Sequence, residues 1–224
     1  MKESEYFKFD IGTLLPGLLF TLFIWVIYTI EVKYHLNFTS YGVRPERLSG
    51  LRGVLFSPFI HSDLSHLWSN TLPSLVLITG LTYFYRNIRW KVLIIGFLLT
   101  GLMTWIIGRP SFHIGASGLI YMLASFLFFK GVFTKHYRML ALSFIVAFFY
   151  GSMVWYVLPI KVGMSWEGHL SGGVVGLLLA VFTKNKLPEK RKYKWEESDF
   201  VVEDDPFMRH FDEDGNFIEL DEEE

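Results

Sequence analysis

The sequence predicts an all-α polytopic membrane protein with six transmembrane helices. The 224-residue chain is 51% hydrophobic and 18% aromatic, which makes it more apolar than an ordinary soluble domain. Its apolar residues also gather into blocks close to the length that a helix needs to cross the hydrocarbon core of a bilayer. The six blocks are residues 11–30, 66–85, 92–107, 117–133, 139–158 and 168–182.

The first block is predicted to stay in the chain as a helix, because no cleavable signal peptide is evident. It follows the mixed-charge start MKESEYFKFD and lacks the small-residue cleavage site of a secretory signal. The connection from residue 31 to residue 65 mixes leucines and phenylalanines with glycines and arginines. That mixture is typical of a segment lying in the membrane interface. The later blocks follow through shorter connections, and the third and sixth are the shortest of the six.

The net charge of −1 conceals two parts of opposite sign. Residues 1–195 carry 20 Lys and Arg against 8 Asp and Glu, whereas residues 196–224 carry 1 Arg against 14 Asp and Glu. A strongly acidic segment with little apolar surface cannot order itself. We therefore expect a cytoplasmic N-terminus (1–10), a six-helix membrane domain (11–183), and a basic juxtamembrane segment with an acidic, disordered tail (184–224). The chain has no cysteine, so disulfides are excluded.

The distribution of basic residues predicts the orientation. Six spans place both termini on one side of the membrane. If that side is the cytoplasm, the inner segments carry 14 Lys and Arg and the outer loops carry 6, as the positive-inside rule requires. The densest basic cluster, KNKLPEKRKYKW, directly follows the last block, where it would meet anionic lipid headgroups. Both termini are therefore expected in the cytoplasm.

Ionisable side chains inside a membrane are costly, so each one requires a reason. Within the six blocks they are His66, Lys130 and His169. Lys130 lies near the inner end of the fourth block and is expected to snorkel. The even-numbered helices run from outside to inside in the predicted orientation. His66, Ser117 and His169 therefore fall at the outer ends of three different helices, at one depth, whereas His113 is assigned to a loop.

Side chains one helical turn away extend this polar cluster. Asn70 follows His66 by four residues and so shares its helix face. An imidazole and a carboxamide can both donate hydrogen bonds to an oxyanion formed in acyl transfer. Tyr121 stands in the same relation to Ser117, where its ring could position a histidine by stacking.

Structural interpretations remain open for each of these residues. A serine between Gly115 and Gly118 can serve close helix packing, as can Gly172, Gly173 and Gly176. Intramembrane histidines can also relay protons in a transporter, although the six blocks contain no Asp or Glu. The histidines lack the spacing of a helical zinc site. We therefore expect no metal and no cofactor.

Taken together, three motifs resemble the rhomboid family of intramembrane serine proteases over residues 10–183. The motifs are PFIHSDLSHLWSN (58–70), GASGLIY (115–121) and GHLSGGVVG (168–176). The resemblance implies a rhomboid-like helical bundle and a Ser–His dyad without a carboxylate, with Ser117 as nucleophile and His169 as general base. Many members carry a Trp-Arg pair in the first loop. Here the comparable stretch is SGLRGVLFSPF, in which Arg52 is the counterpart of the arginine and the tryptophan is missing.

The resemblance also assigns supporting roles. His66 and Asn70, with the backbone N–H of Ser117, would form the oxyanion site. Gly115 would allow close approach of the substrate, His61 and Tyr121 would support the site, and Gly172 and Gly176 would bring the last helix to the fourth.

The function expected from these observations is an intramembrane serine endopeptidase. It would hydrolyse peptide bonds in or near the transmembrane segments of membrane proteins, from a site opening to the extracytoplasmic side of a bacterial inner membrane. The alternative is a pseudoprotease that binds transmembrane helices without cleaving them. The expected partners are transmembrane substrates and the lipid bilayer, with no nucleic acid. The sequence leaves the oligomeric state open.

Overall fold

The computed structural model describes residues 6–134, 136–161, 163–188, 193, 201, 205–212 and 214–219. The chain divides into two compact units, one formed by residues 7–186 and the other by residues 1–6 and 187–224. The first unit contains all the residues that carry the predicted site.

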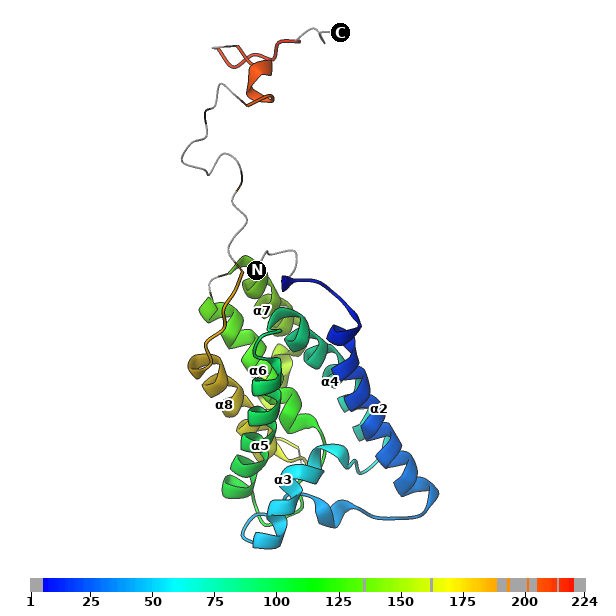
Figure 1. Ribbon diagram of the computed structural model, residues 1–224. Coiled ribbons are helices and arrows are strands. Elements are labelled where there is room, and N and C mark those ends of the chain that lie inside the picture. Colours follow the sequence, from blue (N-terminus) through cyan, green and yellow to red (C-terminus); the bar gives the residue numbers. More distant parts are fainter. Residues whose placement is uncertain are drawn as a thin grey trace. The chain divides into compact units, whose positions relative to one another are not determined.

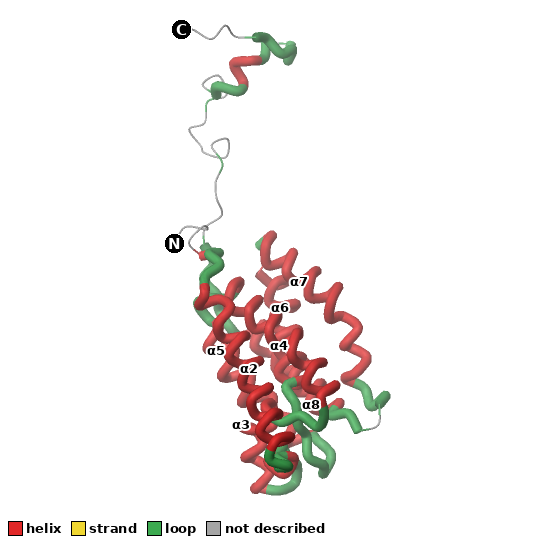
Figure 2. The backbone as a smooth tube through the Cα atoms, turned by 90° about the vertical axis from the view of Figure 1, so that its right-hand side faces the viewer, coloured by secondary structure: helices red, strands yellow, loops and turns green. Residues whose placement is uncertain are grey.

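Six longer helices form the first unit, and the described residues contain no strand beyond isolated bridges. Figures 1 and 2 show these helices running alongside one another. They are α2 (Ile11–Lys33), α4 (Leu64–Phe84), α5 (Arg89–Ile107), α6 (Ser117–Thr134), α7 (Tyr137–Tyr150) and α8 (Trp166–Phe182). The all-helical prediction is therefore confirmed for the described part of the chain.

Among the described residues, four segments are long and apolar enough to cross a membrane: α2, α5, α6 and the stretch Tyr137–Val157 that joins α7 to η4 (Gly151–Val157). Helix α8 is apolar but shorter, and α4 is interrupted by polar residues along LSHLWSNTLPS. The helical membrane bundle is thus supported, whereas the number of six spans stays a prediction.

Capping residues explain where two of the helices begin. The Asp63 carboxylate accepts a hydrogen bond from His66 N at 2.9 Å and so starts α4 at Leu64. Ser165 Oγ accepts from Gly168 N at 3.3 Å and starts α8 at Trp166. The last helix is therefore longer than the predicted block by two residues. Glu167, just outside the predicted block, lies buried in the first turn of α8.

The loop after α2 contains four short helical segments: η1 (Thr39–Tyr41), η2 (Leu48–Arg52), α3 (Gly53–Phe56) and η3 (Ser57–Phe59). It packs against α2 and α5 at the end of the bundle where α6 begins. A two-way backbone bridge ties Val43 to His113, at 3.0 and 2.8 Å. This loop therefore holds the segment that precedes Ser117. Arg52 donates to Ser40 O at 2.9 Å and lies over the Tyr41 ring. These contacts stabilise the loop itself.

Helix α6 lies at the centre of the unit and contacts α4, α5, α7 and α8. Its approach to α8 is closest, because glycines face α6 at two positions. A Cβ atom on Gly172 would lie 2.1 Å from Gly118 O, and one on Gly176 would lie 2.3 Å from Met122 O. Small residues allow such backbone contact between apolar helices.

Lys130 does not snorkel as expected. Its side chain is buried, and Nζ donates to Ala180 O at 3.0 Å and to Thr183 O. These carbonyls belong to the end of α8, where a cation is favoured by the helix dipole and by unpaired carbonyl groups. The lysine is thus a C-terminal cap supplied by the neighbouring helix.

The second unit includes η7 (Met208–His210) and an antiparallel bridge between Phe211 and Phe217. The prediction of a disordered tail falls in part on residues outside the described ranges, and it stays a prediction.

Two neighbouring glycines test the α6–α8 contact. In Gly172→Ala the new methyl group meets backbone atoms, so we expect the free energy of unfolding in detergent to fall by about 1–3 kcal/mol. A Cβ on Gly173 would meet nothing within 4 Å. Gly173→Ala is therefore the control and should stabilise the helix by about 0.5–1 kcal/mol. Equal effects of the two substitutions on unfolding would contradict the packing described above.

Candidate active site

Ser117 and His169 meet where α6 and α8 begin. Ser117 is the first residue of α6, His169 lies in the first turns of α8, and Ser117 Oγ is 2.9 Å from His169 Nε2. That distance is a hydrogen bond. The glycine contact between the two helices makes the approach possible. Ser117 also belongs to the first turn of a helix, where backbone N–H groups have no partner within the helix.

The other ring nitrogen of His169 fixes the tautomer of the imidazole. Nδ1 lies 2.9 Å from the backbone oxygen of Tyr156. A carbonyl oxygen only accepts, so Nδ1 carries the proton and Nε2 presents its lone pair to the Ser117 hydroxyl. The dyad thus has an orienting acceptor, although it is a backbone carbonyl rather than a carboxylate.

Tyr121 lies flat against the same imidazole. The two ring centroids are 4.2 Å apart and the ring planes differ by 7°. The Tyr121 hydroxyl donates to Met153 O at 2.7 Å. Met153 and Tyr156 both belong to η4, so this short segment after α7 holds the histidine and the ring stacked on it.

His66 faces the loop before Ser117. A Cβ on Gly115 would lie 2.5 Å from His66 Nε2, and Gly115 has φ +101. Both the space and the backbone conformation therefore require glycine at this position. His66 Nδ1 lies 3.2 Å from Ser62 Oγ. The structure thus brings His66 and Gly115 together, beside the nucleophile candidate.

Asn70 is buried one turn further along α4, and its Nδ2 donates to His66 O at 2.8 Å. The carboxamide is therefore tied to the backbone of its own helix. An amide nitrogen carries two hydrogens, so a second N–H remains for another acceptor.

His61 packs edge-on against His66, with ring centroids 5.0 Å apart. It lies in the loop before α4 and its side chain is 3% exposed. Burial, reinforced by the nearby His66, lowers the pKa of His61 to about 4. The ring is therefore neutral at physiological pH and supports His66 by packing.

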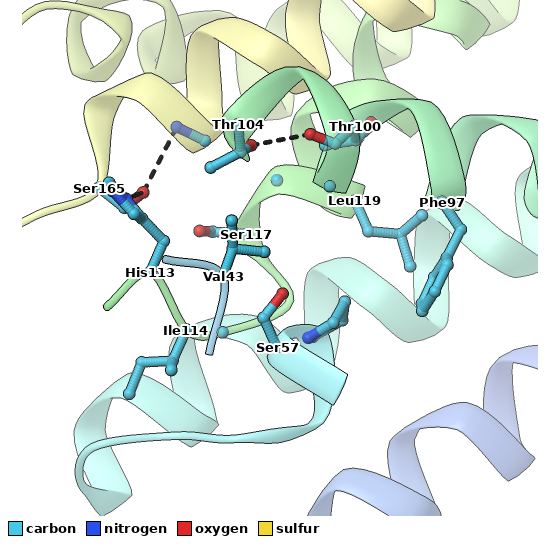
Figure 3. Close-up of a pocket in the computed structure, with 15 residues that line it drawn as sticks. Val43, Ser57, Phe97, Thr100, Thr104, His113, Ile114, Ser117, Leu119 and Ser165 are labelled. Atoms are coloured by element: carbon cyan, nitrogen blue, oxygen red, sulfur yellow. Dashed lines mark hydrogen bonds between the residues drawn. The ribbon is translucent and has the colours of Figure 1, made fainter. Parts of the chain in front are cut away.

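A small cavity adjoins Ser117, as Figure 3 shows. Its volume is about 40 Å³, which gives room for at least one water molecule. The polar side chains that line it are Ser57, Thr100, Thr104, His113, Ser117 and Ser165. Hydrolysis needs water, and this cavity provides space for it directly beside the serine.

Sequence reasoning missed a second serine–histidine contact. His113, assigned to a loop, is 4% exposed, and its Nδ1 lies 2.6 Å from Ser165 Oγ. Beside it, Arg109 Nη1 and Glu167 Oε1 form an ion pair at 3.3 Å. The signal was present in the sequence, because residues 113 and 165 are separated by the same 52 positions as residues 117 and 169.

Among the residues that the structure describes, no three His, Cys, Asp or Glu side chains are grouped so that they could hold a metal ion. The arrangement described above can abstract a proton from a serine hydroxyl without one.

The chain is similar to known proteins across this region. Residues 49–186 match the family described as Rhomboid domain. An uncharacterized protein of Mycobacterium bovis and one of Mycobacterium tuberculosis are each 37% identical over 175 residues, which cover 70% of this chain and 71% of theirs. An uncharacterized protein of Mycobacterium leprae is 31% identical over 181 residues, covering 73% of this chain and 70% of its own.

The buried His61 predicts a pH dependence of stability. The unfolded chain binds a proton near pH 6.5, whereas the folded protein does so only near pH 4. Stability is therefore complete above about pH 6.5 and falls as the pH drops towards 4, by about 3 kcal/mol at most. Urea unfolding in detergent at pH 7 and pH 4.5 should show a smaller loss for His61→Phe than for the wild type. An identical loss would contradict the neutral, buried assignment.

Proposed function

The chain belongs to the rhomboid family of intramembrane proteases and pseudoproteases, and we propose that it is an active serine endopeptidase. The family match makes it an integral membrane protein, in keeping with its long apolar helices. The observation that carries the proposal is the 2.9 Å contact between Ser117 Oγ and His169 Nε2, because a nucleophile within hydrogen-bond reach of an oriented base is the minimum for acyl transfer.

In the first half of the reaction, Ser117 Oγ attacks the carbonyl carbon of the scissile bond while its proton passes to His169 Nε2. The negative charge moves to the carbonyl oxygen. The backbone N–H of Ser117, the His66 ring and the free N–H of Asn70 are the donors assigned to that oxygen. Collapse of the tetrahedral intermediate breaks the C–N bond, and Nε2 returns the proton to the leaving amine.

In the second half, a water molecule attacks the ester carbonyl of the acyl-enzyme. Nε2 takes the proton from this water and then protonates Ser117 Oγ as the C–O bond breaks, which releases the new carboxyl terminus. The cavity lined by Ser117, Thr100 and Thr104 supplies space for the water.

In both halves of the reaction the His169 ring becomes an imidazolium cation, and its positive charge needs a group that stabilises it. In soluble serine proteases a carboxylate holds the ring and stabilises its charge. Here the Tyr156 carbonyl accepts from Nδ1 at 2.9 Å and the Tyr121 ring covers one face of the imidazole at 4.2 Å. A carbonyl dipole and an aromatic face both favour a cation, and neither introduces a charge into the bilayer.

We propose that six spans cross the membrane with both termini in the cytoplasm. The site then opens to the extracytoplasmic side, and the mycobacterial relatives favour a bacterial inner membrane. The proposed substrates are transmembrane proteins. A helix must unwind to expose a peptide bond, so substrates with Gly or Pro near the outer face are favoured.

Substitution of the dyad tests the activity. Ser117→Ala and His169→Ala should each abolish cleavage of a model transmembrane substrate in proteoliposomes. A fluorophosphonate should label the wild type at Ser117, because it phosphonylates only an activated hydroxyl. Ser65→Ala, an exposed serine at the same end of the unit, should cleave and label as the wild type does.

Two results would contradict this proposal. Cleavage by Ser117→Ala at the wild-type rate would assign the activity to another residue. A folded wild type that neither cleaves nor labels would be a pseudoprotease that binds transmembrane helices.

The absence of native cysteine permits a clean test of topology. Ser40→Cys lies in the loop after α2, and Lys184→Cys follows α8; both positions are exposed. A membrane-impermeant maleimide should label Ser40→Cys in intact cells, and should label Lys184→Cys only after the membrane is opened. The reverse pattern would place the termini outside.

A further inference from the structure

Two serine–histidine contacts link the segment that leads into α6 to the segment that leads into α8. They lie four residues apart along each segment. His113 and Ser165 form the outer contact at 2.6 Å, and Ser117 and His169 form the inner contact at 2.9 Å. Each residue of the outer contact precedes its inner counterpart by four positions. The residue types are exchanged, since the histidine comes from the α5–α6 loop in the outer contact and from α8 in the inner one.

The outer contact is fully hydrogen-bonded in a single tautomer. His113 Nε2 lies 3.0 Å from Arg109 O, a group that only accepts, so Nε2 carries the proton and Nδ1 accepts from the Ser165 hydroxyl. Ser165 Oγ in turn accepts from Gly168 N at 3.3 Å. Its hydroxyl therefore links the loop before Ser117 to the first turn of the helix that carries His169.

This bonding argues against a second catalytic pair. The proton of Ser165 Oγ already points at Nδ1, but the oxygen is the N-cap of α8, and an attack on substrate would remove it from that cap.

The ion pair beside it reinforces the same connection. Arg109 Nη1 lies 3.3 Å from the buried carboxylate of Glu167, and Arg109 Nη2 donates to Met164 O at 2.6 Å. The Arg109 backbone N–H also donates to Glu167 Oε1 at 3.3 Å. The loop residues 109–113 are thereby attached to residues 164–167 at several points.

We propose that His113 and Ser165 are positioning residues that set the distance and angle between Ser117 and His169. The proposal rests on the proposed function, since it concerns the same dyad. Helices α6 and α8 are joined near the dyad by glycine contacts, which are van der Waals contacts between the two backbones. The hydrogen bond between His113 and Ser165, four residues before the dyad, adds a directional constraint that the glycine contacts do not provide. A displacement of about 1 Å at reacting groups can cost roughly 100-fold in rate.

The position of His113 and Ser165 is also compatible with a barrier that controls entry to the cavity. The experiment must distinguish this role from positioning. His113 and Ser165 line the cavity that holds Ser117, and they also line an outer pocket with Arg109 and Lys161. They therefore stand between the two spaces. If they served as a barrier to entry, shortening them would speed the reaction of a small probe rather than slow it.

The test uses full-length protein in detergent and two variants at each position. His113→Phe keeps the ring and removes both nitrogens, whereas His113→Asn keeps an acceptor near the place of Nδ1. Ser165→Ala removes the hydroxyl, and Ser165→Gly removes it at a position where glycine is nearly as good an N-cap as serine. Ser40→Ala, at an exposed loop serine, is the control. The measurements are the rate of fluorophosphonate labelling at Ser117, kcat and KM for substrate cleavage, and the unfolding midpoint.

We expect His113→Phe and Ser165→Gly to slow labelling by about 10- to 100-fold and to lower kcat with KM unchanged. His113→Asn should recover most of the rate, and the double variant His113→Phe/Ser165→Gly should be no slower than either single variant, because the two residues make one interaction. These results must appear in variants whose unfolding midpoint matches the control.

Wild-type labelling rates in His113→Phe and Ser165→Gly would overturn the positioning role, and faster labelling would replace it with a barrier role. The positioning role would also be overturned if the rate fell only in variants with a lowered unfolding midpoint and did not recover in His113→Asn. Failure of the wild type itself to label would refute the proposed function instead. The wild type therefore tests the proposed function, and the variants test the positioning role.

Discussion

The close contact between the backbones of α6 and α8 is the constraint on which the rest of the site depends. Within the membrane there is no hydrophobic driving force to bring apolar helices together, so packing at short range must do it. Gly172 and Gly176 leave no room for a Cβ against Gly118 O and Met122 O. That proximity brings the start of α8 to the start of α6. Ser117 and His169 can then share a hydrogen bond although they lie on separate helices.

A second constraint follows from the first: every polar group brought between these helices needs a partner without access to bulk water. The chain meets that need chiefly with backbone carbonyls. Lys130 donates to the end of α8, Tyr121 to Met153 O, and His169 to Tyr156 O. A carbonyl accepts a hydrogen bond without carrying a charge, and so avoids the desolvation cost of a buried carboxylate. The dyad is thereby oriented at low electrostatic cost.

The sequence predicted the helices well because hydrophobic blocks of bilayer length have few alternatives, and all six longer helices begin within about three residues of their predicted blocks. It also placed His66, Ser117 and His169 at one end of the bundle, since each lies at the start of an even-numbered helix and alternate helices run in the same direction. It could not predict that η4 supports His169, because the acceptor is a backbone carbonyl and every residue type has one. Glu167 was missed for a different reason. The Ser165 cap extends α8 backwards into a polar stretch that hydropathy alone assigns to a loop.

Support of the histidine by η4 links its orientation to α7. Helix α7 packs mainly on α6, and η4 continues directly from it to contact α8. The two η4 carbonyls, of Met153 and Tyr156, fix the Tyr121 hydroxyl and the His169 Nδ1 proton. A movement of α7 large enough to displace η4 would break both hydrogen bonds and free the imidazole to rotate or to change tautomer. The proposed base therefore keeps this orientation only while α7 and η4 are in place, whereas Ser117 lies at the glycine contact of α6 with α8. Of the two members of the dyad, the histidine is the one whose geometry the surrounding fold can alter.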